Sequence, residues 1–209
     1  MATESNRRFD DLASDYDKPR TIQRAQAVAE AIRNQLDITP TMHALDFGAG
    51  TGLISLALRP YLGSIIAVDK SQGMLDELRE KIESQGIDGI VPVMCDNFVE
   101  EYSGGPLDLI YSVMTMHHIG DVDAVLQAFY RLLKLGGLVA VSDLDAEDGS
   151  FHSDTTEVHH HGFNRDQMVD LFENAGFQRI ATSTAYTYTK EAADGKVRDF
   201  SMLLITAQK

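Results

Sequence analysis

A glycine-rich turn that follows a short apolar run constrains the fold of this chain more than any other feature. The stretch ALDFGAGTG, from Ala44 to Gly52, alternates three glycines with other residues, and the apolar run LISLAL comes directly after it. Glycine has no Cβ, so its backbone can approach a ligand closely. A helix that begins after such a turn offers free N–H groups to an anionic group. The stretch therefore predicts a strand, a ligand-binding turn and a helix in succession.

The remaining sequence repeats this alternation of short apolar runs and amphipathic segments. Apolar residues at steps of three and four predict helices, whereas short runs without a period of two predict strands that are buried on both faces. The expected helices cover residues 21–36, 53–58, 72–85, 121–135 and 164–175. The expected strands cover residues 42–47, 64–69, 90–96, 107–113, 138–144, 177–189 and 198–207, and the last two should form an antiparallel hairpin. This order predicts one α/β domain over residues 1–209, with a mainly parallel sheet and helices on both faces.

The charge balance and the cysteine content limit the partners and the compartment. The chain has a net charge of −14, with 32 acidic and 18 basic residues and no cluster of Lys and Arg, so we expect no nucleic-acid partner. Cys95 is the single cysteine, which excludes an intrachain disulfide and suits a reducing compartment. The sequence starts without an apolar leader and contains no apolar run of membrane-spanning length. We therefore expect a soluble, cytoplasmic protein without a membrane partner.

An acidic residue at the end of the second expected strand narrows the choice of ligand. Asp69 ends the run SIIAVD, and an acid at that position can accept hydrogen bonds from ribose hydroxyls. A dinucleotide fingerprint has a third glycine where this chain has Leu53. The glycines and Asp69 together therefore indicate a nucleoside ligand without identifying it.

With four further stretches, the turn resembles the class I S-adenosylmethionine-dependent methyltransferases, of the small, stand-alone type that acts on small molecules. The matching stretches are FDDLASDYDKPR, LDFGAGTG, VDKSQGML, CDNF and LDLIYSVMTMHHI, and the resemblance covers nearly the whole chain. It implies a Rossmann-like, doubly wound sheet of seven strands with an antiparallel last strand. It also implies S-adenosylmethionine as the cofactor and methyl transfer by in-line displacement. Residues 1–37 would form an N-terminal lid and helix, and the polar segment 146–162 would be a substrate-side loop.

The resemblance implies roles for particular residues. Asp69 would hold the ribose, and Met74 would lie against the adenine. Asp96 would lie near the adenine amino group with Asn97 beside it, and Tyr16 would reach the methionine end. The full set of residues expected to bind the cofactor is Tyr16, Asp46, Gly48, Ala49, Gly50, Asp69, Lys70, Met74, Asp96, Asn97 and Val113.

Histidines are the candidate catalytic residues. His117 and His118 follow the fourth expected strand, where an acceptor would meet the cofactor, and a neutral imidazole can take a proton near pH 7. His160 is a third candidate, from the polar segment. That segment contains His152, Asp154, Glu157, His159, His160 and His161. Adjacent residues of an extended segment point to opposite faces, so the three consecutive histidines cannot all bind one ion. We therefore expect no metal site.

Three alternatives remain open on sequence grounds. One is a non-catalytic module that binds S-adenosylmethionine or S-adenosylhomocysteine. The second is a nicotinamide-dependent oxidoreductase, against which Leu53 and the terminal hairpin count. The third is a metal-dependent enzyme that uses the histidines of the polar segment. The sequence identifies neither the methyl acceptor nor its accepting atom, nor whether a general base is used, nor the oligomeric state.

Overall fold

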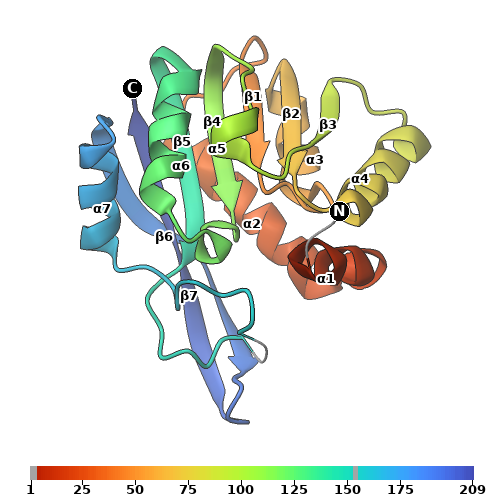
Figure 1. Ribbon diagram of the computed structural model, residues 1–209, viewed down its shortest axis with the longest axis vertical. Coiled ribbons are helices and arrows are strands. Elements are labelled where there is room, and N and C mark those ends of the chain that lie inside the picture. The colour runs from red at the N-terminus through yellow and green to blue at the C-terminus, as the bar shows by residue number, and fades with distance from the viewer. Residues whose placement is uncertain (1–3, 153–154) are drawn as a thin grey trace.

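The computed structural model describes residues 4–152 and 155–209, and its seven strands form one sheet (Figure 1). The order across the sheet is β3-β2-β1-β4-β5-β7-β6. The strands are β1 His43–Phe47, β2 Ser64–Asp69, β3 Ile90–Met94, β4 Leu107–Val113, β5 Leu133–Leu144, β6 Gln178–Glu191 and β7 Val197–Gln208. The pairs from β3 to β5 are parallel, whereas β7 runs antiparallel to both β5 and β6. The predicted fold, with its antiparallel last strand and terminal hairpin, is confirmed.

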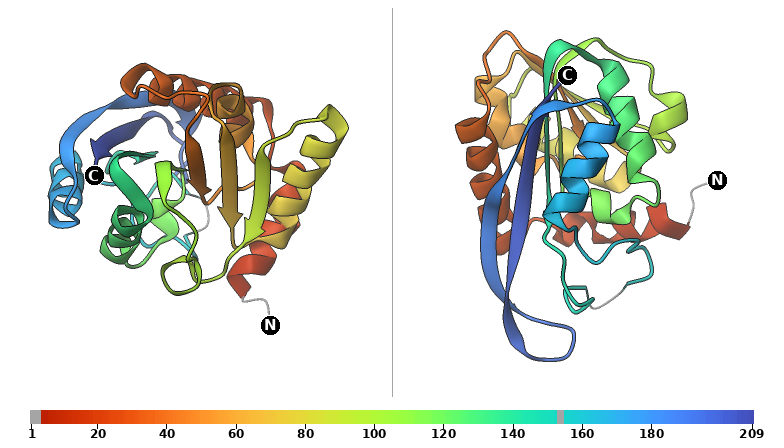
Figure 2. Two further views of the ribbon diagram at one scale, coloured as in Figure 1. Left: turned by 90° about the horizontal axis from the view of Figure 1, so that it is seen from above. Right: turned by 90° about the vertical axis from the view of Figure 1, so that its left-hand side faces the viewer.

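Helices cover both faces of the sheet, as the end-on views in Figure 2 show. Helices α2 Pro19–Gln35, α3 Leu53–Leu58 and α4 Gln72–Gln85 pack on one face, and α5 Phe98–Glu101, α6 Val122–Leu132 and α7 Arg165–Asn174 pack on the other. Helix α1 Glu4–Leu12 and the short 3₁₀ helix Ala13–Asp15 cross the lower end of the sheet. The remaining 3₁₀ helices are Arg59–Tyr61 and Met116–His118. Within the described ranges, no helix is long and apolar enough to cross a membrane.

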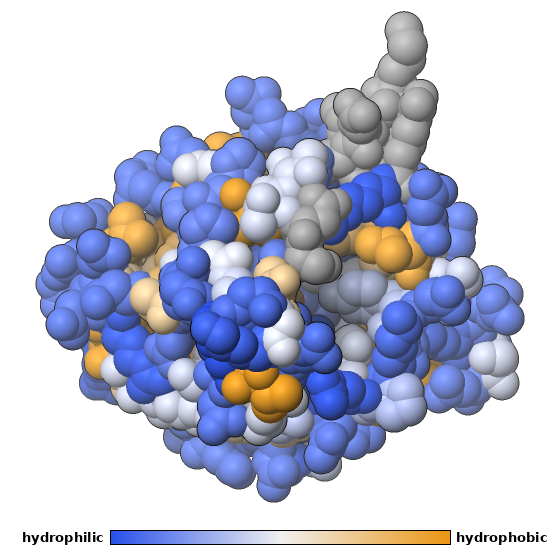
Figure 3. Space-filling view, turned by 90° about the horizontal axis from the view of Figure 1, so that it is seen from below, coloured by the Kyte–Doolittle hydropathy of each residue, from blue (hydrophilic) through white to orange (hydrophobic). Residues whose placement is uncertain are grey.

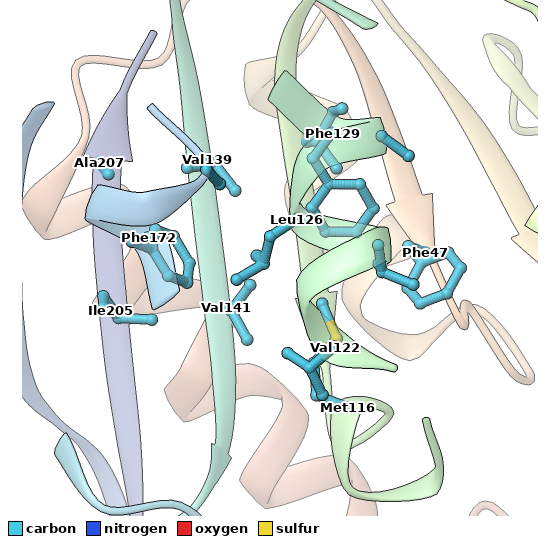
Figure 4. Packing of buried hydrophobic residues seen from close by; sticks show 14 of the residues in the cluster. Phe47, Met116, Val122, Leu126, Phe129, Val139, Val141, Phe172, Ile205 and Ala207 are labelled. Carbon is cyan, nitrogen blue, oxygen red and sulfur yellow. The ribbon is translucent and has the colours of Figure 1, made fainter. Parts of the chain in front are cut away.

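Each face of the sheet has its own apolar cluster. On one face, Phe47, Leu126, Phe129 and Phe172 join β1 to α6 and α7, and all four are buried (Figure 4). The other face joins Ile32 of α2 and Leu58 of α3 to the same strands. Because apolar burial supplies most of the driving force for folding, these clusters form a scaffold that is independent of the polar groups at the strand ends.

Local signals in the sequence set several helix boundaries. The hydroxyl of Ser71 accepts a hydrogen bond from the Met74 amide at the start of α4, and Gly86 ends that helix in the left-handed conformation. Asn164 accepts hydrogen bonds from the amides of Asp166 and Gln167 at the start of α7. These three boundaries are the ones that the sequence predicts.

The predicted helix over residues 121–135 is wrong at its end. Helix α6 stops at Leu132, and Leu133 begins β5, where it lies opposite Leu107 of β4. The glycines Gly136 and Gly137 lie inside β5, at a shift in the register with β4, and do not end the helix. Apolar residues at 132 and 133 fit the buried side of a helix and of a strand equally well, so periodicity alone does not separate the two.

The last two strands extend beyond the rest of the sheet, and the segment after β5 lies beside this extension (Figure 1). The described parts of that segment, 146–152 and 155–162, form no helix or strand. Arg165 binds Asp145 with two hydrogen bonds of 2.7 Å and so fixes the start of α7 to the end of β5. Both ends of the irregular segment are therefore anchored to the sheet.

Candidate active site

A cavity of about 430 Å³ lies at the carboxyl ends of β1, β2 and β4. The chain leaves β1 for β2 on one side and reaches β4 on the other, so the cavity lies at the point where the strand order reverses. From below, the molecule shows a hollow on this face, with hydrophilic residues along much of its rim (Figure 3). The position is the one at which α/β sheets bind ligands.

The structure brings the predicted ligand-binding residues together. The residues on the cavity wall include Tyr16, Asp46, Gly48, Ala49, Gly50, Asp69, Lys70, Met74, Asp96, Asn97 and Val113. His118 lines the cavity as well, whereas His117 and His160 do not belong to its wall. The sequence did not single out Phe9, Thr21 and Arg24, which also line it.

The glycine turn needs glycine at two positions for different reasons. Gly48 has φ = +73°, and a Cβ there would overlap the side chain of Thr115. Gly50 has φ = +54°, but a Cβ there would have no protein atom within 4 Å. A side chain at residue 50 would therefore enter space that belongs to the cavity, which is what a close backbone approach to a ligand requires.

Asp69 holds the glycine turn in place. Its Oδ2 accepts a hydrogen bond of 2.7 Å from the Gly50 amide, and its Oδ1 accepts one of 2.9 Å from the Ser71 amide. Burial raises the pKa of this carboxyl, although these backbone donors oppose the rise. The acid at the end of β2 thus connects the turn after β1 to the start of α4, while lining the cavity.

Asp46 is an almost completely buried acid beneath the turn. Its Oδ2 accepts a hydrogen bond of 2.7 Å from the Ser55 hydroxyl, which lies 3.1 Å from the hydroxyl of Tyr111. Burial raises the pKa of Asp46 to about 7, because the charged form loses its hydration. A cationic group in the cavity would favour ionisation of this carboxyl.

The N-terminal segment is attached to the cavity by two acids that the sequence did not single out. Asp10 Oδ1 accepts hydrogen bonds from the Ser71 hydroxyl (2.6 Å) and the Gly73 amide (2.8 Å) at the start of α4. Asp17 accepts a hydrogen bond of 2.5 Å from the Thr51 hydroxyl and forms an ion pair with Lys81. Both acids lie in the stretch FDDLASDYD, which resembles the family's N-terminal segment. The sequence contains no feature that distinguishes these two acids from solvent-exposed ones.

The histidines separate into different structural positions. His117 is buried, and its Nδ1 lies 2.7 Å from Asp143 Oδ1. Burial alone would raise the pKa of Asp143, but the His117 ring and the amides of His117 and Leu144 lower it. His160 directs Nε2 to the carbonyl oxygen of Ile119 at 2.9 Å, and so fixes the loop that carries His118. Of the three candidate catalytic histidines, His118 is the one on the cavity wall.

His118 has a defined protonation pattern. Its Nδ1 lies 2.6 Å from the carbonyl oxygen of Glu157, and because a carbonyl only accepts, Nδ1 carries the proton and Nε2 keeps its lone pair. Burial, followed by the neighbouring His117, lowers the pKa of His118 to about 4. The ring is therefore neutral at physiological pH.

The polar segment does not bring its histidines together as metal ligands. His152 approaches His117, with ring centroids 4.9 Å apart, and burial lowers the pKa of His152 to about 4. Among residues 4–152 and 155–209, no group of three His, Cys, Asp or Glu side chains could hold a metal ion. Asp154, which the sequence placed near these histidines, lies outside the described residues.

Replacement of Asp46 by Asn should change how stability depends on pH. The folded pKa of about 7 exceeds the ordinary value of 3.8, so the folded protein keeps a proton that the unfolded chain has lost. Stability of the wild type should therefore fall as pH rises from about 4 to 7, by up to roughly 1.4 kcal/mol per pH unit. Urea unfolding at pH 5 and pH 8 measures this effect. Relative to the wild type, the free energy of unfolding of Asp46→Asn should be higher at pH 8 than at pH 5.

A matched control is Asp170→Asn, at an exposed position of α7. An equal pH trend in the two variants would show that the trend does not come from Asp46.

Comparisons with known proteins identify the family of this chain. A family model described as a methyltransferase domain matches residues 20–182. An uncharacterised methyltransferase of Schizosaccharomyces pombe is 32% identical over 169 residues, a match that covers 72% of this chain and 60% of that protein. The chain therefore spans less than two thirds of the length of that relative.

Two solved structures share the fold. The YcgJ protein of Bacillus subtilis has a TM-score of 0.71 at 16% identity, over 87% of this chain and 97% of that one. Phosphoethanolamine N-methyltransferase 2 of Haemonchus contortus, in complex with S-adenosyl-L-methionine, has a TM-score of 0.71 at 18% identity, over 96% of this chain and 60% of that one. Because the family model covers most of the chain, this protein belongs to the class I S-adenosylmethionine-dependent methyltransferases, with S-adenosylmethionine as the cofactor.

Proposed function

We propose that this protein transfers a methyl group from S-adenosylmethionine to a small-molecule acceptor by in-line displacement. The observation that carries the proposal is that one cavity combines the glycine turn, the acids at the strand ends and His118. A small acceptor is supported by the cavity wall, to which Phe9 of α1 and Thr115 and His118 of the segment after β4 contribute. The net charge of −14 argues against a nucleic-acid acceptor.

The residues of the cavity suit this cofactor. The open space beside Gly50 accommodates a ligand that approaches the backbone, and the carboxylate of Asp69 is placed to accept hydrogen bonds from a ribose. Asp96 and Asn97 would bind the adenine end, with Met74 and Val113 on its faces. Tyr16 and Lys70 would border the methionine and ribose regions. The carboxylate of Asp46 would support the positive charge of the cofactor from below the turn.

The chain mainly positions the two reactants. When bound, the cofactor supplies a methyl group on a positively charged sulfur, with a neutral thioether as the leaving group. Acids on the cavity wall attract this cation more strongly than the neutral product. The N-terminal segment, attached through Asp10 and Asp17, excludes water and holds the reactants in alignment.

His118 is the proposed general base where the acceptor must lose a proton. Its Nε2 has a free lone pair, because Nδ1 donates to the carbonyl of Glu157. The proton would move from the acceptor to Nε2 as the acceptor atom attacks the methyl group. Glu157 also pairs with Lys70 at 3.5 Å, which helps to fix the position of this carbonyl at the cavity edge.

The alternatives make different predictions. A non-catalytic module would bind S-adenosylmethionine without transferring its methyl group, and a nicotinamide-dependent oxidoreductase would bind NAD. We also propose a cytoplasmic location, which the single cysteine supports. A transfer assay with labelled cofactor and fractionated small metabolites separates catalysis from mere binding.

Cofactor affinity should depend on Asp69. Calorimetry should detect binding of S-adenosylmethionine and S-adenosylhomocysteine but not of NAD. Asp69→Ala should weaken binding by roughly 1–3 kcal/mol, because it leaves the Gly50 and Ser71 amides without their acceptor and removes the ribose partner. Asp76→Ala, at an exposed position of α4, should bind normally. Unchanged affinity in the Asp69 variant would remove this residue from the cofactor site.

Substitutions in the glycine turn should separate binding from folding. Gly50→Val should abolish cofactor binding while the folded state survives, because its side chain enters open cavity space. Gly48→Ala should instead lower the melting temperature, because the new methyl group overlaps Thr115. Calorimetry and thermal denaturation of both variants test this contrast. Normal binding by Gly50→Val would mean that the ligand does not approach this turn.

His118→Asn should test the base without removing the hydrogen bond to Glu157, because the Asn amide replaces the Nδ1 donor. Once the transfer assay supplies an acceptor, we expect kcat to fall by roughly 10²–10⁴ with cofactor affinity unchanged. The wild type should keep its rate from pH 5 to 8, since His118 has a pKa of about 4, while the variant should recover as pH rises. His160→Gln keeps a donor toward Ile119 and serves as the control. Full activity of His118→Asn would show that no base is needed here.

A further inference from the structure

The cavity wall carries both acidic and basic side chains. Asp46, Asp69 and Asp96 lie at or just after the carboxyl ends of β1, β2 and β3, and Glu100 and Asp121 line the cavity as well, whereas Arg24 reaches the wall from α2. Lys70, a further cation on the wall, pairs with Glu157. Arg24 is therefore the cation of the cavity wall that has no acidic partner among the described residues.

Arg24 and its neighbour Arg20 are unpaired in a strongly acidic protein. Within residues 4–152 and 155–209, neither guanidinium has a hydrogen bond or an ion pair. By contrast, Lys81, Lys134 and Arg165 each form an ion pair with a nearby acid. The two arginines are four residues apart on α2, so they point to the same side of the helix. No acidic residue occupies the first turn of α2.

Lys190 of β6 is a third cation close to Arg20 and Arg24, although only Arg24 of the three belongs to the cavity wall. Gln35, at the end of α2, donates a hydrogen bond to Ser183 of β6, and helix and strand pack against each other (Figure 2). Arg20 lies about 22 Å back along the helix from Gln35, and Lys190 lies about 23 Å along the strand from Ser183. Because the two elements run in opposite directions, Arg20 comes beside Lys190. Like-charge repulsion from Arg20 and Arg24 adds to burial in lowering the pKa of Lys190.

The position of Lys190 is fixed although no carboxylate of the described residues is bound to it. Its Nζ donates a hydrogen bond of 2.6 Å to the Phe151 carbonyl and lies 4.0 Å from the centre of the Phe151 ring. Glu147 is the acid that acts on Lys190 from the neighbouring segment. The Oε2 of Glu147 already accepts from the Phe151 amide, and its Oε1 lies 3.8 Å from His161. Three cations therefore meet where α2, β6 and the segment after β5 come together.

The cofactor offers these three cations only one carboxylate. S-adenosylmethionine also carries two positive charges, so its net charge is positive and the acids at the strand ends suit it. We propose that the methyl acceptor carries an anionic group, either a carboxylate or a phosphate. This group binds Arg24, and Arg20 and Lys190 lie beside it. The proposal rests on the proposed function. Such an acceptor would be drawn to the sulfonium as well as to the arginines, and its anionic group would fix its orientation.

A titration of the complex with S-adenosylhomocysteine tests the anionic site without a known acceptor. The probes are benzoate, inorganic phosphate and the neutral benzamide, added at constant ionic strength, and the readout is the NMR resonances of the arginine Nε–H groups. We expect benzoate or phosphate to shift the resonances of Arg24 and Arg20, and benzamide to leave them unchanged. Arg33, on the same helix but over the ring of Tyr61 at 3.4 Å, should not respond.

Substitutions identify the groups responsible. Arg24→Gln and Lys190→Gln should weaken binding of the anionic probe by about tenfold or more, whereas Arg33→Gln should bind it as the wild type does. Equal shifts with benzamide, equal shifts at Arg33, or no shift with either anion would overturn the proposal.

A second experiment tests whether Arg24 binds the anionic group of the acceptor or the carboxylate of the cofactor. Calorimetry compares S-adenosylmethionine with 5′-methylthioadenosine, which lacks the amino acid part, in the wild type and in Arg24→Gln. If only S-adenosylmethionine loses affinity in the variant, Arg24 binds the cofactor and the proposal is wrong. Unchanged affinity for both supports the acceptor. If the wild type binds neither nucleoside, the proposed function fails, while the probe titration, repeated on the free protein, still decides the anionic site.

Discussion

The site depends on the hydrogen bond between the carboxylate of Asp69 and the amide of Gly50. The turn after β1 has three glycines with positive φ, a conformation that few sequences hold without outside support. Asp69 supplies that support from the end of the next strand, and the same carboxylate also accepts from Ser71 at the start of α4. One side chain thus joins two strand ends and a helix, and it does so on the wall of the cavity. The parallel register of β1 with β2 brings the acid and the turn to the same level.

The sequence predicts most of the fold because each element has a local signal. Short apolar runs without alternation correspond to strands covered on both faces, and Ser71, Gly86 and Asn164 mark helix ends through their own hydrogen bonds or conformation. The end of α6 lacks such a signal. Leu132 and Leu133 are both apolar, and only the pairing of Leu133 with Leu107 across the sheet decides where the helix stops.

The residues of the cavity were predictable where their position in the sequence fixes their position in space. A residue at the carboxyl end of a parallel strand lies at the ligand-binding edge, so the positions of Asp69 and Val113 follow from the strands that carry them, and that of Asp96 from β3, which ends two residues before it. The histidines show the limit of this reasoning. His117 and His118 are adjacent, yet one is buried against Asp143 and the other faces the cavity, because a 3₁₀ turn directs neighbouring side chains differently. Arg24 could not be predicted as a cavity residue, because the sequence of an amphipathic helix does not show whether an arginine on its polar face contacts solvent or a cavity.

The attachment of the N-terminal segment has a consequence for how the molecule responds to its surroundings. Asp10 and Asp17 fasten this segment through partly buried charged hydrogen bonds and an ion pair, whereas the sheet is held by apolar packing on both faces. Dissolved salt screens the first kind of contact and hardly touches the second. The N-terminal segment and the sheet therefore differ in their sensitivity to ionic strength: added salt should weaken the contacts of Asp10 and Asp17 more than the apolar packing of the sheet.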